Sequence, residues 1–383
     1  MRIGIEANAL KNAAGTGVLA RHLIDDLRHR GHDVVEFAHD FSSTGRSRPS
    51  SSRRWLNGVR QVFWTQVTLP LAAARQRVDV LLCPAYVGPL WSPAPLVLMV
   101  LDLTFLLEPQ TGDRLYMGYL RRVVPALVRR ARRVVTISHS AATEIARLLP
   151  AAAGKLEVAY PGPGEIDVTS QRDASNARIA LQRGSRGPAG PDPPPTQGLP
   201  AKYILMVGTL EPRKNYLRAI QAFARFQSQG FSDWQLVIAG GKGWGSEQVD
   251  GLVKQLGLSN AVTLMGRVTP PVLATLYRQA GALFYPSLYE GFGFPILEAM
   301  VAGCPVVTSN RSSMVEVGDA AVELVDPSAV DAMASGLMVV AGDQARRAEL
   351  IERGRARAAE FSWERFGAAV ERTLTAATTP NRD

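Results

Sequence analysis

Short, nearly continuous runs of apolar residues recur along the first half of the chain. They cover residues 2–7, 33–38, 78–83, 96–101, 133–138 and 156–160. Runs that lack polar alternation are typical of parallel strands covered on both faces. The intervening segments 17–30, 113–131 and 139–149 carry apolar residues at helical spacing, and the first of them stops at Gly31. This alternation predicts a doubly wound α/β domain.

The same pattern stops and then resumes in the second half. Residues 161–200 are rich in Pro, Gly, Ser, Arg and Asp and contain too few apolar residues to offset the cost of ordering, which predicts a partly disordered linker. Further strands are expected at 202–208, 235–239, 262–265, 282–285, 305–308 and 322–325. We therefore predict an α/β protein with a first domain over 1–165, a linker over 166–200 and a second domain over 201–362.

Charge and cysteine content narrow the classes of partner and compartment. The 383 residues include 43 Lys and Arg against 34 Asp and Glu, a net charge of +9, which favours an anionic partner such as a phosphorylated substrate, a membrane surface or nucleic acid. Only Cys83 and Cys304 are present, both within apolar runs, which excludes a disulfide framework. No pair of the five histidines has metal-ligand spacing, so no metal site is expected.

The sequence does not predict entry into a membrane. Glu6 interrupts the region where a signal peptide needs an apolar stretch, and Asp102 divides the most apolar segment, 95–107. That segment is shorter than the ~18 residues of a spanning helix. We expect a cytoplasmic protein whose membrane contact, if present, is peripheral on the inner face.

The richest motif begins at the end of the strand predicted over 282–285. A glycine-containing turn follows, with Gly291 and Gly293, and then a helix that Pro295 can start and Gly303 can end. Glycines let backbone N–H groups approach a ligand, and a helix N-terminus favours anions. Glu290 before the helix and Glu298 one turn inside it could both face a ligand and accept hydrogen bonds from sugar hydroxyls. Taken alone, the motif is also compatible with an ordinary strand–turn–helix carrying two solvated glutamates.

A second motif follows the first strand of the second domain. Gly208 opens the segment Gly-Thr-Leu-Glu-Pro-Arg-Lys-Asn, which ends at residue 215. Ligands of doubly wound sheets bind at the carboxyl ends of strands. Arg213 and Lys214 could clamp a diphosphate there, the first through its planar fork and the second as a point charge. Any single Arg-Lys pair can also be a solvated basic turn.

Together the two motifs resemble the retaining glycosyltransferases of family 4. The first matches that family's Glu-x7-Glu signature and the second its Gly-Thr-x-x-Pro-Arg-Lys-Asn segment, with added support from Tyr160-Pro161-Gly162 and from Phe361-Ser362-Trp363-Glu364. The resemblance implies the GT-B fold, two Rossmann-like domains facing a cleft, with a C-terminal helix at about 363–383 that returns to the first domain. It covers the second domain nearly throughout and the first domain loosely.

The resemblance also implies roles for individual residues. Arg213 and Lys214 would neutralise the donor diphosphate as it leaves, Glu290 would bind the transferred sugar, and Glu298 would hold the ribose. Segments 240–242 and 266–268 would border the nucleobase, and the glycine loop at 15–17 would lie against the phosphate. The expected donor-binding residues are Gly15, Gly17, Gly208, Gly240, Lys242, Arg267, Val268, Gly291, Phe292, Gly293, Phe294 and Glu298.

The sequence departs from the family at one important place. Many relatives have His-Asp where this chain has Leu101-Asp102, and Leu101 cannot form the hydrogen bond through which that histidine contacts the sugar. Asp102 stays a catalytic candidate, although a carboxylate at a strand end can equally cap the following turn. Ser138 is expected to cap the helix that follows it.

The implied reaction is a front-face displacement in which the donor diphosphate takes the proton of the acceptor. Arg213 and Lys214 would fill the electrostatic role of a metal, so we expect no cofactor. The expected donor is a nucleotide sugar, with GDP-mannose favoured over UDP-glucose and dTDP-rhamnose, and the expected acceptor is a saccharide. A nucleotide-sugar 2-epimerase, a nucleic-acid-binding protein and a non-catalytic glycan-binding relative are the alternatives. Nucleic acid is disfavoured because the sequence contains no zinc pattern and no aromatic-basic RNA signature.

Clusters of arginine suggest a membrane surface as a further partner. Six arginines between residues 121 and 133 flank Val123, Val124, Leu127 and Val128, and Arg53, Arg54, Trp55, Phe63 and Trp64 lie in an earlier segment. Arginines beside apolar and aromatic residues suit an anionic bilayer, and a polyprenyl-linked saccharide would then be the acceptor. The same pattern fits a solvated basic helix whose apolar stripe faces the core.

Overall fold

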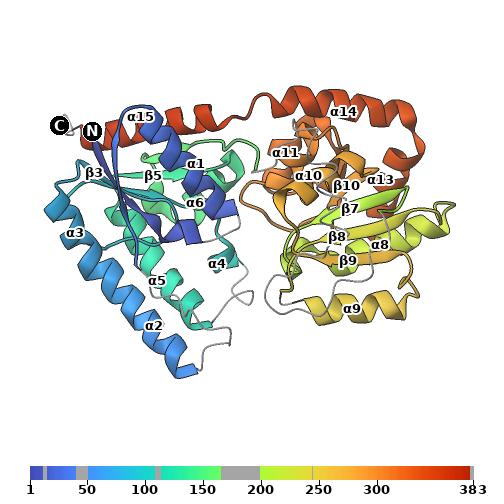
Figure 1. Ribbon diagram of the computed structural model, residues 1–383, viewed down its shortest axis with the longest axis horizontal. Coiled ribbons are helices and arrows are strands. Elements are labelled where there is room, and N and C mark those ends of the chain that lie inside the picture. Colours follow the sequence, from blue (N-terminus) through green and yellow to red (C-terminus); the bar gives the residue numbers. More distant parts are fainter. Residues whose placement is uncertain (12–14, 40–50, 108–113, 165–198, 244, 380–383) are drawn as a thin grey trace. The chain divides into compact units, whose positions relative to one another are not determined.

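The computed structural model describes residues 1–11, 15–39, 51–107, 114–164, 199–243 and 245–379 (Figure 1). The chain forms two compact units. Unit 1 consists of Met1–Gly162 together with Phe361–Asp383, and unit 2 of Pro163–Glu360. Most of the segment expected to be a linker, 166–200, lies outside the described residues.

Unit 1 is built on a parallel six-stranded sheet in the order β2-β1-β3-β4-β5-β6. Its strands are β1 (Arg2–Glu6), β2 (Asp33–Phe37), β3 (Val80–Cys83), β4 (Leu96–Met99), β5 (Arg133–Thr136) and β6 (Leu156–Val158). Its α-helices are α1 (Gly15–His29), α2 (Ser51–Phe63), α3 (Leu69–Gln76), α4 (Thr104–Leu107), α5 (Arg114–Arg130), α6 (His139–Leu148) and α15 (Trp363–Thr378). Short 3-10 helices cover Ala7–Lys11 and Pro150–Ala152, and a π-helical turn, Trp64–Thr68, joins α2 to α3.

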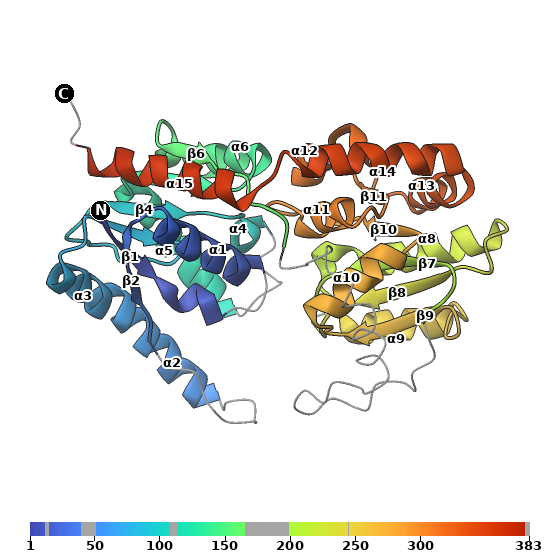
Figure 2. The same cartoon turned by 45° about the horizontal axis from the view of Figure 1, so that its top comes forward.

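The last helix, α15, belongs to the core of unit 1. Its side chains Phe366, Val370 and Leu374 are fully buried. The ring of Trp363 stacks on His22 of α1 at 4.1 Å between centroids. Further along α15, Glu371 forms an ion pair with Arg30, just after the end of α1, at 3.1 Å. Figure 2 shows α15 lying beside α1 within this unit.

Unit 2 repeats the architecture with its own parallel sheet in the order β12-β11-β10-β7-β8-β9. Its strands are β7 (Tyr203–Val207), β8 (Gln235–Ala239), β9 (Val262–Gly266), β10 (Ala282–Tyr285), β11 (Val306–Ser309) and β12 (Glu323–Val325). Its α-helices are α8 (Tyr216–Ser228), α9 (Ser246–Gln255), α10 (Pro270–Gln279), α11 (Phe294–Val301), α12 (Ser313–Gly318), α13 (Val330–Gly342) and α14 (Gln344–Ala358). Two 3-10 turns, Pro212–Lys214 and Asp319–Ala321, complete it. Phe223, Phe226 and Phe284 are fully buried in its main apolar cluster.

All twelve predicted strands are present among the described residues, and six of them end one or two residues earlier than predicted. The α/β class with two parallel sheets is therefore confirmed. The sequence patterns did not predict α2, the π-turn or α3. Helix α2 extends away from the sheet of unit 1 (Figures 1 and 2). None of the helices in the described ranges has the length and apolar character needed to cross a bilayer.

Candidate functional site

The two sequence motifs meet in unit 2 at the point where the strand order reverses. Strand β7 is the first strand of this unit along the chain and lies inside the sheet. Strands β8 and β9 follow on one side of it, and β10 pairs with its other side. The carboxyl ends of β7 and β10 therefore lie side by side, and the connections that follow them lead to strands on opposite sides of this pair. Ligands of doubly wound sheets bind at such a point. The segment from Gly208 to Asn215 follows β7, and the segment from Pro286 to Gly293 follows β10.

One carboxylate and two cations form the centre of this site. Glu290 Oε2 lies 2.6 Å from Arg213 Nη1, and Glu290 Oε1 lies 2.6 Å from Lys214 Nζ. Arg213 Nε also donates to Glu211 at 3.0 Å. Lys214 donates to the hydroxyl of Tyr285, and its ammonium lies 4.6 Å from the centroid of that ring.

Burial makes the charges of this cluster strongly interdependent. Glu290 and Lys214 are both buried. Burial alone would raise the pKa of Glu290, but the charges of Lys214 and Arg213 outweigh it and lower that pKa to about 2. Burial also lowers the pKa of Lys214, against the opposing effect of Glu290. The site thus holds an ionised carboxylate between two cations, away from bulk water.

Backbone and side-chain hydrogen bonds fix the two motifs to each other. Asn215 adopts a left-handed conformation with φ of 61° and donates through Nδ2 to the carbonyls of Pro286 and Pro327, at 3.1 and 2.7 Å. The backbone N–H of Leu288 donates to the carbonyl of Arg213 at 2.7 Å. Asparagine suits this position because it tolerates positive φ better than most residues. The cations are therefore held before any ligand arrives.

Glu298 lies on α11 and is also buried. Tyr277 donates its hydroxyl to Glu298 Oε2 at 2.8 Å. Burial raises the pKa of Glu298 to about 7, and the Tyr277 hydrogen bond and the charge of Lys214 only partly oppose this effect. A Cβ at Gly164 would lie 1.9 Å from Glu298 Oε1, so this carboxylate occupies space that only glycine leaves free.

The glycines after the strands permit close backbone contacts. Gly208 has φ of 132°, and a Cβ at Gly240 would lie 1.8 Å from the carbonyl oxygen of Gly208. Gly240 in turn donates its N–H to Gly266 at 2.8 Å, so the ends of β7, β8 and β9 adjoin. Lys242 and Arg267 follow these ends with exposed side chains, and Val268 is half-buried.

The turn before α11 has the geometry that its sequence indicates. Gly293 precedes the helix with φ of 110°, which favours glycine, and Pro295 occupies its first turn. Phe292 is buried against Phe294 at 5.3 Å between centroids, whereas Gly291 is half-buried. The carbonyl of Glu290 accepts hydrogen bonds from Ser312 and Ser313 at 2.7 and 2.8 Å.

The candidates of the first domain lie in unit 1. Gly15 and Gly17 fall inside the first turn of α1, so the helix predicted from residue 17 already begins at Gly15, where the family resemblance implied a glycine loop. Asp102 Oδ1 accepts the N–H of Thr104 at 2.9 Å and caps the next turn, while Leu101 is buried. Ser138 caps α6 by accepting a hydrogen bond from the N–H of Ala141 at 3.0 Å, as predicted.

The sequence patterns did not mark Glu6 as a candidate site residue. It ends β1 next to β3, where the strand order of unit 1 reverses. Burial raises its pKa to about 7, although Asn8 donates to it at 2.5 Å. The sequence signal that could have identified Glu6 is a charged residue at the end of an otherwise apolar strand. The described residues contain no cluster of three or more His, Cys, Asp or Glu that could hold a metal ion.

Two family models match the chain, one in each half. Residues 13–163 match "Glycosyltransferase Family 4", and residues 196–357 match "Glycosyl transferases group 1". The O-antigen chain mannosyltransferase B of Escherichia coli is 39% identical over 163 residues, which are 42% of each chain. The O-antigen chain mannosyltransferase RfbU of Salmonella typhimurium is 27% identical over 50% of this chain and 46% of its own length. The matched regions thus span less than half of these relatives.

Solved structures share the fold over the full length. A sucrose-phosphate synthase from Thermosynechococcus elongatus gives a TM-score of 0.74 at 19% identity and covers 98% of this chain and 100% of its own. HepE of Anabaena, solved in complex with UDP and glucose, gives 0.66 at 17% identity, with 98% and 99% covered. The two parallel α/β sheets, the two family models and these neighbours define the GT-B fold. The chain belongs to the glycosyltransferases, with a Family 4 domain followed by a group 1 domain.

Proposed function

We propose that this protein transfers a hexose, with mannose favoured, from a nucleotide-diphosphate sugar to a saccharide acceptor, with retention of configuration. The observation that carries the proposal is the Arg213–Glu290–Lys214 cluster, with Glu290 and Lys214 buried and Arg213 half-buried, at the point where the strand order of unit 2 reverses. Two preorganised cations beside glycine-rich strand ends suit a diphosphate whose charge grows as it leaves. Mannose is supported by the two O-antigen mannosyltransferases among the relatives.

The proposed chemistry uses positioning and charge. The acceptor hydroxyl would attack the anomeric carbon on the face from which the diphosphate departs, and a diphosphate oxygen would take the hydroxyl proton. The bond from the anomeric carbon to the diphosphate would break while the new glycosidic bond forms on the same face. Arg213 and Lys214 would stabilise the departing oxygens, and no protein nucleophile is required.

The ligand-free cluster suggests an additional role for Glu290. Both cations are paired with this carboxylate, so an arriving diphosphate must share or replace its contacts. Glu290 would keep the buried Lys214 and the half-buried Arg213 compensated while the site is empty. It could then turn toward the hydroxyls of the transferred sugar, whereas Glu298 would meet the ribose.

A panel of GDP-mannose, UDP-glucose and dTDP-rhamnose tests the proposal. Radiolabelled donors incubated with saccharide acceptors should yield a labelled glycan with GDP-mannose above the other two. Release of a 2-epimer without an acceptor would indicate an epimerase instead. Stabilisation by a donor with neither transfer nor epimerisation would indicate a non-catalytic glycan-binding protein, the alternative that Leu101 leaves open.

The structure changes the basis of the membrane hypothesis. Val124, Leu127 and Val128 of α5 are fully buried and Trp64 is buried, so these side chains cannot enter a bilayer. The side chains of Arg53, Arg54 and Trp55 lie outside the described part. Apolar side chains instead stand exposed along α2 and its continuation: Leu56, Val59, Val62, Phe63, Val67 and Leu71, with Phe63 61% exposed.

We propose that this α2 stripe contacts an anionic membrane that presents a polyprenyl-diphosphate-linked acceptor. Leu56, Val59 and Phe63 recur at helical spacing, which is the pattern of helices that lie in the bilayer interface, and Arg60 is exposed beside them. Phe63→Ser should reduce flotation with anionic vesicles, whereas Val315→Ser, an exposed apolar residue of unit 2, should not. Equal flotation with neutral and anionic vesicles would argue against the proposal.

A further inference from the structure

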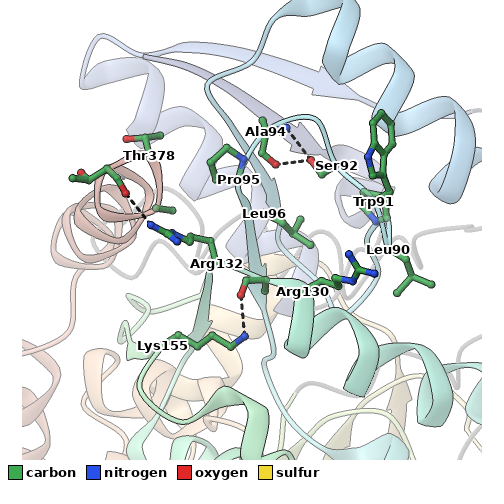
Figure 3. Close-up of a pocket in the computed structure, with 14 residues that line it drawn as sticks. Leu90, Trp91, Ser92, Ala94, Pro95, Leu96, Arg130, Arg132, Lys155 and Thr378 are labelled. Carbon is green, nitrogen blue, oxygen red and sulfur yellow. Dashed lines mark hydrogen bonds between the residues drawn. The ribbon is translucent and has the colours of Figure 1, made fainter. Parts of the chain in front are cut away.

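A pocket of about 610 Å³ lies in unit 1 at the edge of the sheet opposite Glu6 and Asp102 (Figure 3). Its walls come from the residues just before β4, from the link between α5 and β5, and from the end of α15. Because parallel strands share their amino ends at one edge, this pocket is remote from the carboxyl edge of the same sheet. Its volume falls within the range of small-molecule sites.

The lining of the pocket is strongly cationic. Arg130, Arg132 and Lys155 contribute side chains, and none of the fourteen lining residues is acidic. Among the described residues, none of these three cations forms an ion pair. Three uncompensated cations around one cavity repel one another, so an anion would stabilise the arrangement.

Two of the cations also hold the walls together. Lys155 donates to the carbonyls of Arg129 and Ala131, at 3.1 and 3.0 Å, and Arg132 donates to the carbonyl of Thr379 at 3.0 Å. An ammonium has three donors and a guanidinium has five, so both retain donors for a ligand. Arg130 has no hydrogen-bond or ion-pair partner within the described chain, and all of its donors are available.

The rim beside Arg130 is apolar. Trp91 is 57% exposed and Leu90 is 38% exposed, and both belong to the loop before β4. Figure 3 shows the side chain of Arg130 extending toward Leu90. Gln66 fixes this loop, since it donates to the carbonyl of Gly88 at 3.0 Å and accepts from the N–H of Leu90 at 2.9 Å. An exposed tryptophan on a tethered loop provides a surface for an apolar group.

We propose that this pocket binds a phosphate ester that carries an apolar group, with Arg130 and Arg132 on the phosphate and Trp91 on the apolar part. Guanidinium groups bind phosphate oxygens through paired donors, which suits these two side chains. The site is independent of the proposed sugar transfer, because none of its residues belongs to the donor site in unit 2. The phosphate could come from a lipid headgroup or from a soluble ester.

Titration of the full-length protein can distinguish the two sources. The soluble probes are glycerol 3-phosphate and dihexanoyl phosphatidic acid kept below its micelle concentration, with dihexanoyl phosphatidylcholine as the zwitterionic match. Monomeric lipids avoid adsorption to a bilayer through α2. Calorimetry gives the affinity, and tryptophan fluorescence, compared with a Trp91→Phe variant, reports contact with the rim.

Arg130→Gln is the main test variant because no described contact depends on that side chain. It should weaken binding of dihexanoyl phosphatidic acid by at least about tenfold, a loss expected for one charge-assisted contact. Arg129→Gln, one residue away and not lining the pocket, should bind like the unchanged protein. Tighter binding of the lipid than of glycerol 3-phosphate would support a lipid source whose apolar part contacts Trp91, and equal affinities would overturn the apolar part of the proposal. Absence of saturable binding, or binding that Arg130→Gln leaves unchanged, would overturn the proposal.

Discussion

The positions of Arg213 and Lys214 lead to a kinetic prediction. If both cations act on the diphosphate as its charge develops, they stabilise the transition state more than the bound donor. Arg213→Ala and Lys214→Ala should each lower turnover by roughly 10²–10³-fold, the scale found when one preorganised donor is removed. Glu298→Ala should mainly raise the donor KM, because its ribose contacts persist through the reaction. Steady-state kinetics of the three variants would check this order.

A control separates chemistry from folding in this series. Arg225 in α8 is 57% exposed and pairs only with the exposed Asp331 in the described structure, so Arg225→Ala should keep normal kinetics. Circular dichroism melts would establish that each variant is folded. Full turnover in folded Arg213→Ala and Lys214→Ala would show that the diphosphate assignment is wrong.

Glu290 should compete with the diphosphate product for the same two cations. Glu290→Gln removes the negative charge but keeps the shape, so GDP should bind at least several-fold more tightly than to the unchanged protein. Turnover should nevertheless fall, since the proposed contact with the transferred sugar is weakened. Isothermal titration with GDP measures the first effect directly. Weaker binding of GDP by a folded Glu290→Gln variant would contradict the competition.

The buried carboxylates should make stability depend on pH. Glu6 and Glu298 have pKa values raised to about 7 from an ordinary 4.5, because burial disfavours their charged forms. Between these values the unfolded chain ionises them and the folded chain does not, so the free energy of unfolding should fall as pH rises from about 4.5 to 7. Each group contributes about 3 kcal/mol at 1.36 kcal/mol per unit. Glu290, with a pKa of about 2, has the opposite effect: as pH falls below about 4.5, the unfolded chain binds its proton first, and the free energy of unfolding falls.

Urea unfolding across this pH window provides the measurement. Glu298→Gln should flatten the pH dependence of unit 2 and raise its stability at pH 8. Glu6→Gln should do the same for unit 1. A pH dependence that neither substitution changes would mean that both carboxylates are already ionised in the folded protein.

At the scale of elements, the close approach of β7 and β8 should tolerate no side chain at residue 240. A Cβ there would lie 1.8 Å from a backbone oxygen, which cannot rotate away. Gly240→Ala should therefore destabilise unit 2 by about 1–3 kcal/mol, as overpacking typically does. Gly251→Ala in α9, where nothing lies within 4 Å, should instead stabilise the helix by about 0.5–1 kcal/mol. Chemical denaturation of the two variants would compare them.

The strands were predictable because each is a short, mainly apolar run, and the central strands β3, β4, β10 and β11 are buried along their whole length. Helix α2 was not, because its apolar side chains face solvent and its arginines interrupt the pattern. The sequence motifs identified Arg213, Lys214, Glu290 and Glu298 as candidates. They could not show that Glu290 pairs with both cations, because Arg213 and Glu290 are 77 residues apart and meet only through the pairing of β7 with β10. Tyr277 and Tyr285 were missed for the same reason.

For the whole molecule, two separate cores should give separable unfolding transitions. Leu374 of α15 is fully buried in unit 1 and Leu337 of α13 is fully buried in unit 2. Replacing either with Ala should cost about 2–5 kcal/mol. Differential scanning calorimetry should show that Leu374→Ala shifts one transition and Leu337→Ala the other. A single transition shifted equally by both variants would indicate that the units unfold together.

The position of α15 also has a consequence for synthesis on the ribosome. Domains usually fold in the order in which they emerge, beginning with the N-terminal one. Here the apolar surface that α15 covers in unit 1 stays open until Trp363–Thr378 have left the exit tunnel, whereas unit 2 is continuous from Pro163 to Glu360 and is complete before then. The part of the protein translated first should thus be the last to reach its native state. Until then its exposed apolar surface makes it a substrate for chaperones.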